Sequence, residues 1–446
     1  MSEVANIVVS GKKKTGWTAL LLAGMLLVPV YFAHAGGGVI YVDHSATGDN
    51  DGGSWANAFT DLQAALTAAG AGDEIWVAAG VYKPVVPSDP DDVTEAEREA
   101  TFNLVSGVGL YGGFVGNESD RDQRDWLTHI TVLSGDIDDN DSVDDRGVVL
   151  DANDIQGRNS YTVVTGIGVD TATVIDGFLI TAGGNDQAFG FGGGMRNGNG
   201  DPTVSNIHFI GNRADSGGGM YTEVSSPTLI NLRFSGNRAS YMGGGLYVNA
   251  SDATLINASF IGNVAQRNGG GMVNQASDTI LTNLSFSGNS TLGDFDESGG
   301  AIFNLSGGNP VIRNTIIWQN RDSTGTGSPT ASIGNFSANP QISFSLIQGC
   351  NPDGAWNANC GSDAGDNLAD ANPLFIDTPN PTGDAPITGN LRLQEGSPAI
   401  NAGNNDFVVD VSTDLDGGPR ILPEGGTVDL GPYELLSEIL FRDRFE

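Results

Sequence analysis

A glycine-led repeat of about 26 residues runs through the middle of the chain. Triple-glycine blocks begin at Gly192, Gly217, Gly243 and Gly269, and a related Gly-Gly-Ala block begins at Gly299. Successive blocks start 25, 26, 26 and 30 residues apart. Each of the first four repeats also contains the sequence Asn-x-x-Phe-x-Gly-Asn. A register this strict predicts a solenoid, in which each unit packs against the next one.

Apolar and polar side chains alternate between the glycines and the Gly-Asn pair. Leu232 shares the face of Phe234, whereas Arg233 points the other way. This period of two predicts strands, and the clustered glycines disfavour helices. One repeat at about 3.3 Å per residue traces roughly 80 Å, which is enough for three short strands and three turns in a closed coil. We therefore expect an all-β fold, a right-handed parallel β-helix.

One phenylalanine and one asparagine keep the same place in every repeat. Inward phenylalanines, one per coil, imply a stack of rings about 4.8 Å apart. The Gly-Asn pair suits a corner because both residues tolerate positive φ, and asparagine amides at one corner hydrogen-bond along the stack. The predicted structural ladder consists of Phe209, Phe234, Phe260, Phe286, Asn212, Asn237, Asn263 and Asn289.

The N-terminus has the three parts of a bacterial export signal. A lysine cluster precedes a mostly apolar stretch over residues 17–32, and the small residues Ala33 and Ala35 stand where signal peptidase reads. The stretch is shorter than the roughly 20 residues that span a bilayer. We expect residues 1–35 to be a signal peptide cleaved after Ala35. The mature chain is then exported and contains no membrane-spanning segment.

Charge and cysteine content limit the partners and the cross-links. Asp and Glu total 54 against 20 Lys and Arg, a net charge of -34. A nucleic-acid binder needs a basic surface for phosphates, so we expect no nucleic-acid partner. Two cysteines are too few for a disulfide scaffold. Export places them in an oxidising compartment, which predicts one disulfide between Cys350 and Cys360.

These motifs resemble exported bacterial proteins. The Phe-x-x-Asn blocks and Gly-Gly-Ala-Ile at Gly299 are similar to the repeats of polymorphic outer membrane proteins. The C-terminal block Gly396–Gly403 resembles part of a choice-of-anchor region. Further blocks resemble the start of secreted right-handed β-helix repeat proteins: Ile40–Asp43, Gly53–Phe59, Ile75–Pro84, Tyr111–Phe114 and Leu133–Asp136. The resemblance implies a pectin-lyase-like solenoid at the outer-membrane surface or outside the cell, in a Gram-negative bacterium.

The rest of the chain is arranged around the repeats. Phe59 and Leu66 lie on one face of an amphipathic stretch over residues 59–69, which we expect to form a helix that caps the N-terminal end of the stack. The expected organisation is a signal peptide over 1–35, an N-terminal cap and first coil over 36–100, parallel β-helix repeats over 101–345, C-terminal coils and a choice-of-anchor-like region over 346–436, and a short tail over 437–446.

An acidic loop over residues 136–145 is the best candidate for a bound ion. Oxygen-bearing side chains alternate at its start, as in the first ligands of a calcium loop. Asp141 stands where the helical calcium loop has glycine, and Gly147 stands where it has a bidentate glutamate. A solvated acidic loop is therefore the alternative. We expect modest calcium binding, with calcium as the one cofactor, by Asp136, Asp138, Asn140 and Asp144.

The outward column beside the phenylalanines predicts a binding surface. It consists of His208, Arg233, Ser259 and Ser285, which we expect to lie on the surface, with no carboxylate among them. Catalysis needs acid and base groups that converge on one face, so we assign no catalytic residue. We expect a non-enzymatic protein for adhesion or surface structure, with a polysaccharide or a protein as its ligand. The alternative is a polysaccharide lyase or hydrolase, or a glycan-binding module, because many β-helix proteins act on polysaccharides.

Overall fold

The structure is a computed structural model that describes residues 37–293, 298–382, 388–408 and 411–435. The predicted signal peptide, its cleavage residues Ala33 and Ala35, and the tail over residues 437–446 lie outside this described part. Within the described ranges, no helix combines the length and the apolar character needed to cross a bilayer.

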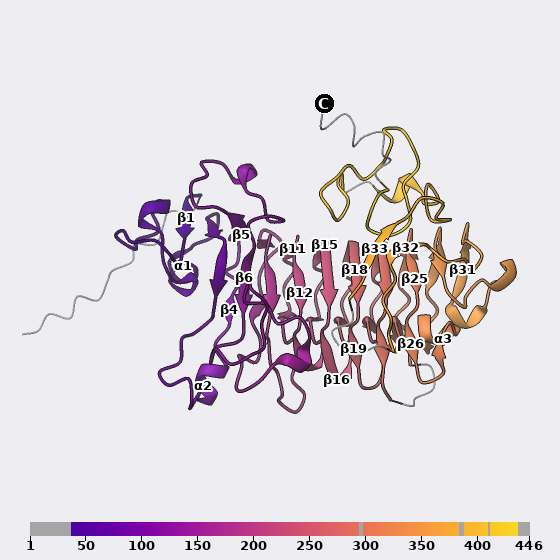
Figure 1. The fold of residues 1–446 in the computed structure, drawn as a ribbon, viewed down its shortest axis with the longest axis horizontal. Coiled ribbons are helices and arrows are strands. Elements are labelled where there is room, and N and C mark those ends of the chain that lie inside the picture. Colours follow the sequence, from indigo (N-terminus) through magenta and orange to yellow (C-terminus); the bar gives the residue numbers. More distant parts are fainter. Residues whose placement is uncertain (1–36, 294–297, 383–387, 409–410, 436–446) are drawn as a thin grey trace, which may run out of the picture. The chain divides into compact units, whose positions relative to one another are not determined.

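The described chain winds into a parallel β-helix, as the repeat predicts (Figure 1). One coil passes from β10 (Met195–Gly198) through β11 (Thr203–Ser205) and β12 (His208–Ile210) to β13 (Arg213–Ser216). The next strand, β14 (Met220–Glu223), pairs in parallel with β10, one coil earlier. Repetition of this path stacks the coils in register, and the described coils form three sheets.

The largest sheet has 17 described strands, because two neighbouring columns of strands join in it. Three of its strands, β15, β18 and β21, have eight residues and bend at an asparagine with positive φ, namely Asn231, Asn257 and Asn283. The strands of this sheet are β1 (Val39–Val42), β2 (Glu74–Ala78), β3 (Gly80–Tyr82), β5 (Gly109–Phe114), β6 (Thr131–Ser134), β8 (Val174–Asp176), β9 (Leu179–Thr181), β11, β12, β15 (Thr228–Ser235), β18 (Thr254–Ile261), β21 (Ile280–Ser287), β24 (Val311–Arg313), β25 (Ile316–Trp318), β29 (Gln341–Ser343), β30 (Leu346–Ile347) and β31 (Ser362–Gly365).

Two smaller sheets close the coil. The sheet of eight described strands contains β4 (Phe102–Asn103), β7 (Val164–Ile167), β10, β14, β17 (Leu246–Asn249), β20 (Met272–Gln275), β23 (Ile302–Leu305) and β28 (Ile333–Phe336). The sheet of six contains β13, β16 (Arg238–Met242), β19 (Val264–Ala265), β22 (Ser290–Thr291), β26 (Arg321–Asp322) and β27 (Gly325–Thr326). Between β10 and β17 short turns join the three sheets, and buried side chains fill the interior of each coil.

The interior of the repeats is a column of stacked rings. The four ladder phenylalanines are fully buried, and their ring centroids lie 5.0, 4.6 and 4.3 Å apart along the column. Beside them runs the inner asparagine ladder, Asn212, Asn237, Asn263 and Asn289. The amide of Asn263, for example, donates to the carbonyl of Phe234 at 2.9 Å and to Oδ1 of Asn289 at 2.9 Å. Each asparagine thus satisfies backbone and side-chain groups that no water reaches.

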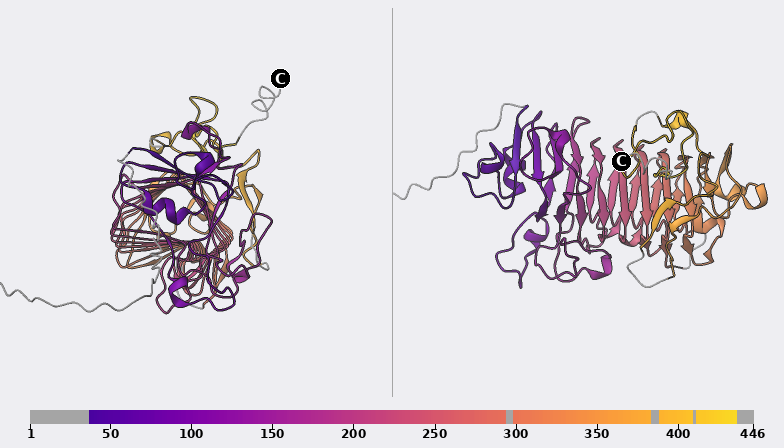
Figure 2. Two further views of the ribbon diagram at one scale, coloured as in Figure 1. Left: turned by 90° about the vertical axis from the view of Figure 1, so that its left-hand side faces the viewer. Right: turned by 45° about the horizontal axis from the view of Figure 1, so that its top comes forward.

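A short helix covers the N-terminal end of the core. At the N-terminal end, α1 (Leu62–Ala68) buries Leu62 and Leu66 against the first strands, and Figure 2 (left) shows this indigo helix over the coil interior. The helix is shorter than expected, because Asp61 caps its N-terminus and Phe59 instead bridges to Val42. Short helices α2 (Glu95–Arg98) and α3 (Pro329–Ser332) lie in loops.

The predicted disulfide between Cys350 and Cys360 is confirmed. Both cysteines are fully buried and belong to the main hydrophobic core. Trp356, within the closed loop, packs against the same core and donates its ring N–H to the carbonyl of Gly361 at 2.8 Å. The disulfide loop therefore covers the C-terminal end of the column.

After β31 the chain leaves the coils and packs against their side. We call residues 373–382, 388–408 and 411–434 the C-terminal segment, which includes the antiparallel pair β32 (Phe375–Asp377) and β33 (Asn390–Leu393). It runs beside the orange and pink coils in Figures 1 and 2. Its buried side chains form a second core with Ile316 and Leu346 of the coils. The segment therefore covers part of the large sheet.

Candidate functional site

The bend of each coil carries an outer ladder of asparagines. Their side-chain amides are linked by hydrogen bonds of 3.0 to 3.1 Å, and all five residues have φ between 50° and 59°. Asparagine suits this position because it tolerates the left-handed conformation. The outer asparagine ladder consists of Asn206, Asn231, Asn257, Asn283 and Asn314.

The C-terminal segment occupies only one end of this ladder. Asn257 donates to the carbonyl of Thr413 at 2.8 Å, and Asn314 donates to the carbonyl of Asn404 at 3.1 Å. Asn257 and Asn314 are fully buried, whereas Asn206 and Asn231 are half-buried and line a pocket. The ladder therefore passes from a closed end to an open one.

The covering segment corrects our expectation of a surface column. Ser259 and Ser285 are 2 % and 0 % exposed, so this part of the column does not face solvent. The reason is a segment distant in the sequence, since Gly431 lies against the hydroxyl of Ser285. His208 and Arg233, which precede them in the column, remain half-buried.

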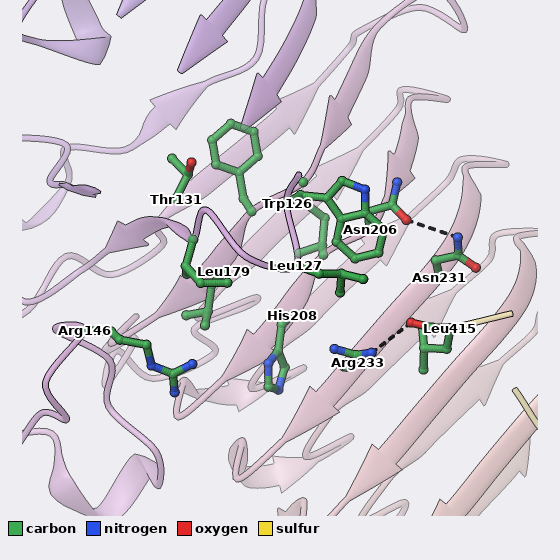
Figure 3. Close-up of a pocket in the computed structure, with 14 residues that line it drawn as sticks. Trp126, Leu127, Thr131, Arg146, Leu179, Asn206, His208, Asn231, Arg233 and Leu415 are labelled. Carbon is green, nitrogen blue, oxygen red and sulfur yellow. Dashed lines mark hydrogen bonds between the residues drawn. The ribbon is translucent and has the colours of Figure 1, made fainter. Parts of the chain in front are cut away.

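The open end of the ladder forms the floor of a pocket of about 160 Å³ (Figure 3). Trp126 and Leu127 come from the loop after β5, and Arg146 directly follows the acidic loop. His208 of β12 and Arg233 of β15 rise from the large sheet. Leu415 of the C-terminal segment closes the remaining side.

A second pocket, of about 260 Å³, adjoins the first one. His208 and Arg233 line both pockets, and the second adds Arg392 and Tyr433 of the C-terminal segment. Because the two pockets share side chains, we treat them as one surface, the lateral groove. It is defined by Trp126, Arg146, Asn206, His208, Asn231, Arg233, Arg392 and Tyr433.

The arginines of the lateral groove use only some of their N–H donors to bind acidic partners. Arg233 donates to the carbonyl of Leu415 at 2.8 Å and lies 3.3 Å from a carboxylate oxygen of Asp416. Arg392 binds the same carboxylate and lies 4.7 Å above the ring of Tyr433. Since a guanidinium carries five N–H donors, each arginine keeps donors for a further acceptor.

Arg146 supplies the third guanidinium of the groove. It donates through Nε and Nη2 to Asp144 at 2.9 and 2.6 Å, and the exposed fraction of its side chain is 53 %. The groove therefore contains three arginines against the carboxylates of Asp144 and Asp416. This local excess of positive charge stands in a chain of net charge -34.

His208 is not suited to proton transfer near neutral pH. Its Nε2 lies 2.6 Å from the hydroxyl of Ser235. Burial, followed by the positive charges of Arg233 and Arg146, lowers the pKa of His208 to about 3. The imidazole is therefore neutral, and a group with so low a pKa is a weak base. The lateral groove offers hydrogen bonds, positive charge and the half-buried ring of Trp126, which suit binding.

The predicted calcium ligands belong to the acidic loop, and none of them is a lining residue of the two groove pockets. Asp136 and Asp138 are buried, and Asp138 accepts the backbone N–H of Arg158 at 2.8 Å. Asn140 is exposed, and Asp144 pairs with Arg146. Among the described residues, no three His, Cys, Asp or Glu side chains are grouped to hold a metal ion. Calcium binding stays a prediction.

Sequence patterns did not point to several residues of the groove. Trp126, Arg146, Arg392 and Tyr433 each occur once, outside the repeats, so no periodic signal marks them. Arg233 and Asp416 are 183 residues apart in the chain. Only His208, Arg233 and the asparagines were visible as a column, because the repeat aligns them.

Comparisons with known proteins agree with the repeat. Residues 283–305 match the Chlamydia polymorphic membrane protein repeat. No curated protein matches the chain. Among solved structures, pectate lyase Pel9A is 14 % identical, covers 90 % of this chain and 97 % of its own, and has a TM-score of 0.45. A rhamnogalacturonan lyase is 12 % identical, with coverages of 91 % and 98 % and a TM-score of 0.33. Pectin methylesterase PemA from Erwinia chrysanthemi is 11 % identical, with coverages of 69 % and 90 % and a TM-score of 0.29. These scores are too low to carry over the role of any residue.

Proposed function

We propose that this protein is a non-enzymatic binding protein of the bacterial outer surface, and that its lateral groove holds an acidic polysaccharide. The repeat over residues 283–305, which matches that of polymorphic membrane proteins, supports the surface location. The single observation that carries the proposed ligand is the groove itself, where three arginines line two adjoining pockets.

Each chemical feature of the groove has a counterpart in an acidic sugar. Guanidinium groups such as that of Arg233 bind carboxylates through paired hydrogen bonds. The amides of Asn206 and Asn231 can donate to and accept from sugar hydroxyls. The half-buried ring of Trp126 offers apolar surface to a sugar ring. The shared side chains of the two pockets give an extended surface, which suits a polymer better than a single sugar.

Binding of polygalacturonate to the mature protein tests this function. We expect binding that weakens as salt rises, because exposed charges are screened. Dextran, a neutral polymer, serves as the control ligand. Arg233→Gln is expected to weaken binding roughly tenfold or more, since one hydrogen bond to a charged group contributes about 1.5 to 3 kcal/mol. Trp126→Ala provides a second variant that leaves the coil interior unchanged.

A matched control variant is Arg158→Gln, whose arginine pairs with Glu95 outside the groove. It should bind polygalacturonate as the unmodified protein does. Equal binding by all three variants would show that the groove is not the site. Release of unsaturated or reducing ends from the polymer, abolished by a change in the groove, would instead establish the enzymatic alternative.

A further inference from the structure

A separate cavity lies near the N-terminal end of the β-helix. Its volume is about 420 Å³, and it shares no lining residue with either pocket of the lateral groove. His44 follows the block Ile40–Asp43, Lys83 belongs to Ile75–Pro84, and Asp136 ends Leu133–Asp136. Three N-terminal sequence blocks, far apart in the chain, therefore meet around one cavity.

The rim of this cavity is apolar and open to solvent. Val81, Val86 and Val143 line it, with exposed fractions of 38 %, 85 % and 44 %. Exposed valines are costly to keep in water, and a ligand with an aliphatic part would cover them. An apolar rim around a few polar groups is the usual composition of a small-molecule site.

The polar wall contains a buried carboxylate that is not fully satisfied. Asp136 is 6 % exposed, and its Oδ1 accepts the backbone N–H of Asn140 at 3.2 Å. Its Oδ2 makes no hydrogen bond to the described residues. A positively charged donor at Oδ2 would give this oxygen a hydrogen-bond partner that the described residues do not supply.

Lys83, the cation that lines this cavity, does not bind Asp136 Oδ2. Lys83 forms an ion pair with Asp139 at the mouth of the cavity. Asp61 also lines the cavity, and its Oδ1 accepts the N–H of Gln63 at the start of α1. With Lys83 and Asp139 balanced, Asp61 and Asp136 leave the lining negative, and His44 at the exposed edge is the remaining titratable group besides Tyr82.

We propose that this cavity binds a primary alkylammonium group, with the ammonium on Asp136 Oδ2 and the aliphatic chain against Val81, Val86 and Val143. Such a group occurs on a free alkylamine and on a lysine side chain of another protein. The inference does not depend on the lateral groove, because the two sites have no residue in common.

Calorimetric titration of the mature protein with n-pentylamine tests the proposal. Pentan-1-ol and pentanoate have the same aliphatic chain without the positive charge, and we expect each to bind about tenfold more weakly or not at all. Asp136→Asn should weaken pentylamine binding by about tenfold or more, because the amide keeps the shape and removes the charge. Val86→Ala should weaken it less, since it removes only rim surface.

Asp252→Asn is the matched control, because Asp252 is exposed on the repeats and accepts the backbone N–H of Asp278. A lysine-containing tripeptide forms a second arm of the experiment. Tighter binding of the peptide than of pentylamine would indicate a protein partner, and the reverse order would indicate a free amine.

Three results would overturn the proposal, and the first two concern pentylamine. One is equal binding of pentylamine and pentanoate, and the other is unchanged pentylamine binding by Asp136→Asn in a protein with an unaltered melt. Binding of Ca²⁺ alone, without pentylamine binding and lost in Asp136→Asn, would also overturn it and would support the calcium prediction.

Discussion

The repeats and the C-terminal segment both bury apolar side chains, but they are held together in different ways. In the repeats, Phe260 lies between Phe234 and Phe286, and the same contact recurs from coil to coil. In the C-terminal segment, Arg420 is 1 % exposed and forms a single ion pair with Glu434. The coils are therefore stabilised by a repeated contact, whereas the C-terminal segment is stabilised by contacts that occur once.

Phe260→Ala removes one ring from the middle of the repeated contact. We expect the free energy of unfolding to fall by about 3 to 5 kcal/mol, because the variant leaves a cavity in a close-packed column. Chemical denaturation measures the loss. Asn249→Ala is the control, since the half-buried Asn249 only donates to the hydroxyl of Tyr221, and it should cost less than ~1 kcal/mol. Equal midpoints would contradict the role of the stacked rings.

Arg420→Met breaks the contact that occurs once. It leaves the carboxylate of Glu434 buried without its partner, which costs about 3 to 5 kcal/mol in comparable sites. Since the coils do not use this pair, the C-terminal segment should open while the coils stay folded. Hydrogen exchange followed by mass spectrometry should show faster exchange in residues 411–434 and unchanged exchange in β15, β18 and β21. Faster exchange in both regions would mean that they unfold as one unit.

Removal of the disulfide tests the end of the column rather than its middle. Replacing Cys350 and Cys360 together by serine should lower the free energy of unfolding by about 2 to 3 kcal/mol, since the loop that they close is short. Chemical reduction of the disulfide in the unmodified protein should lower the free energy of unfolding by a similar amount. A midpoint that does not move would show that the loop covers the core without the covalent bond.

The pH dependence of His208 gives the smallest expected effect. Its pKa in the folded protein, about 3, lies below its ordinary value of 6.5, so the unfolded chain takes up this proton more readily. The stability that neutral His208 contributes is fully present above pH 6.5 and is lost as the pH falls toward 3. Between pH 7.5 and 4.5, the unmodified protein should therefore lose more stability than His208→Gln. Equal losses would show that the pKa of His208 is not lowered in the folded protein.

The sequence predicts the repeats in more detail than it predicts the lateral groove. The stack through Phe234 and Phe260 could be placed because each repeat supplies an independent copy of one pattern, and a period of two fixes which face is buried. Of the lateral groove, the sequence could predict only the residues of the floor that the repeat aligns, such as His208 and Arg233. Trp126 and Arg392 reach it through loops with no periodicity, and their positions follow from tertiary packing.

The in-register stacking of coils has a consequence for how such a gene can change in length. Each repeat presents the same backbone hydrogen-bonding pattern to the coil before it and to the coil after it. An in-frame duplication of one 26-residue unit therefore adds a coil that makes the same kind of contacts as its neighbours. The C-terminal segment restricts where this is tolerated, because it is fastened to Arg233, Asn257 and Asn314. A coil inserted between these fastening points would separate them by about 4.8 Å more than the segment spans. An added coil is therefore penalised between Arg233 and Asn314, where it would pull these fastening points apart.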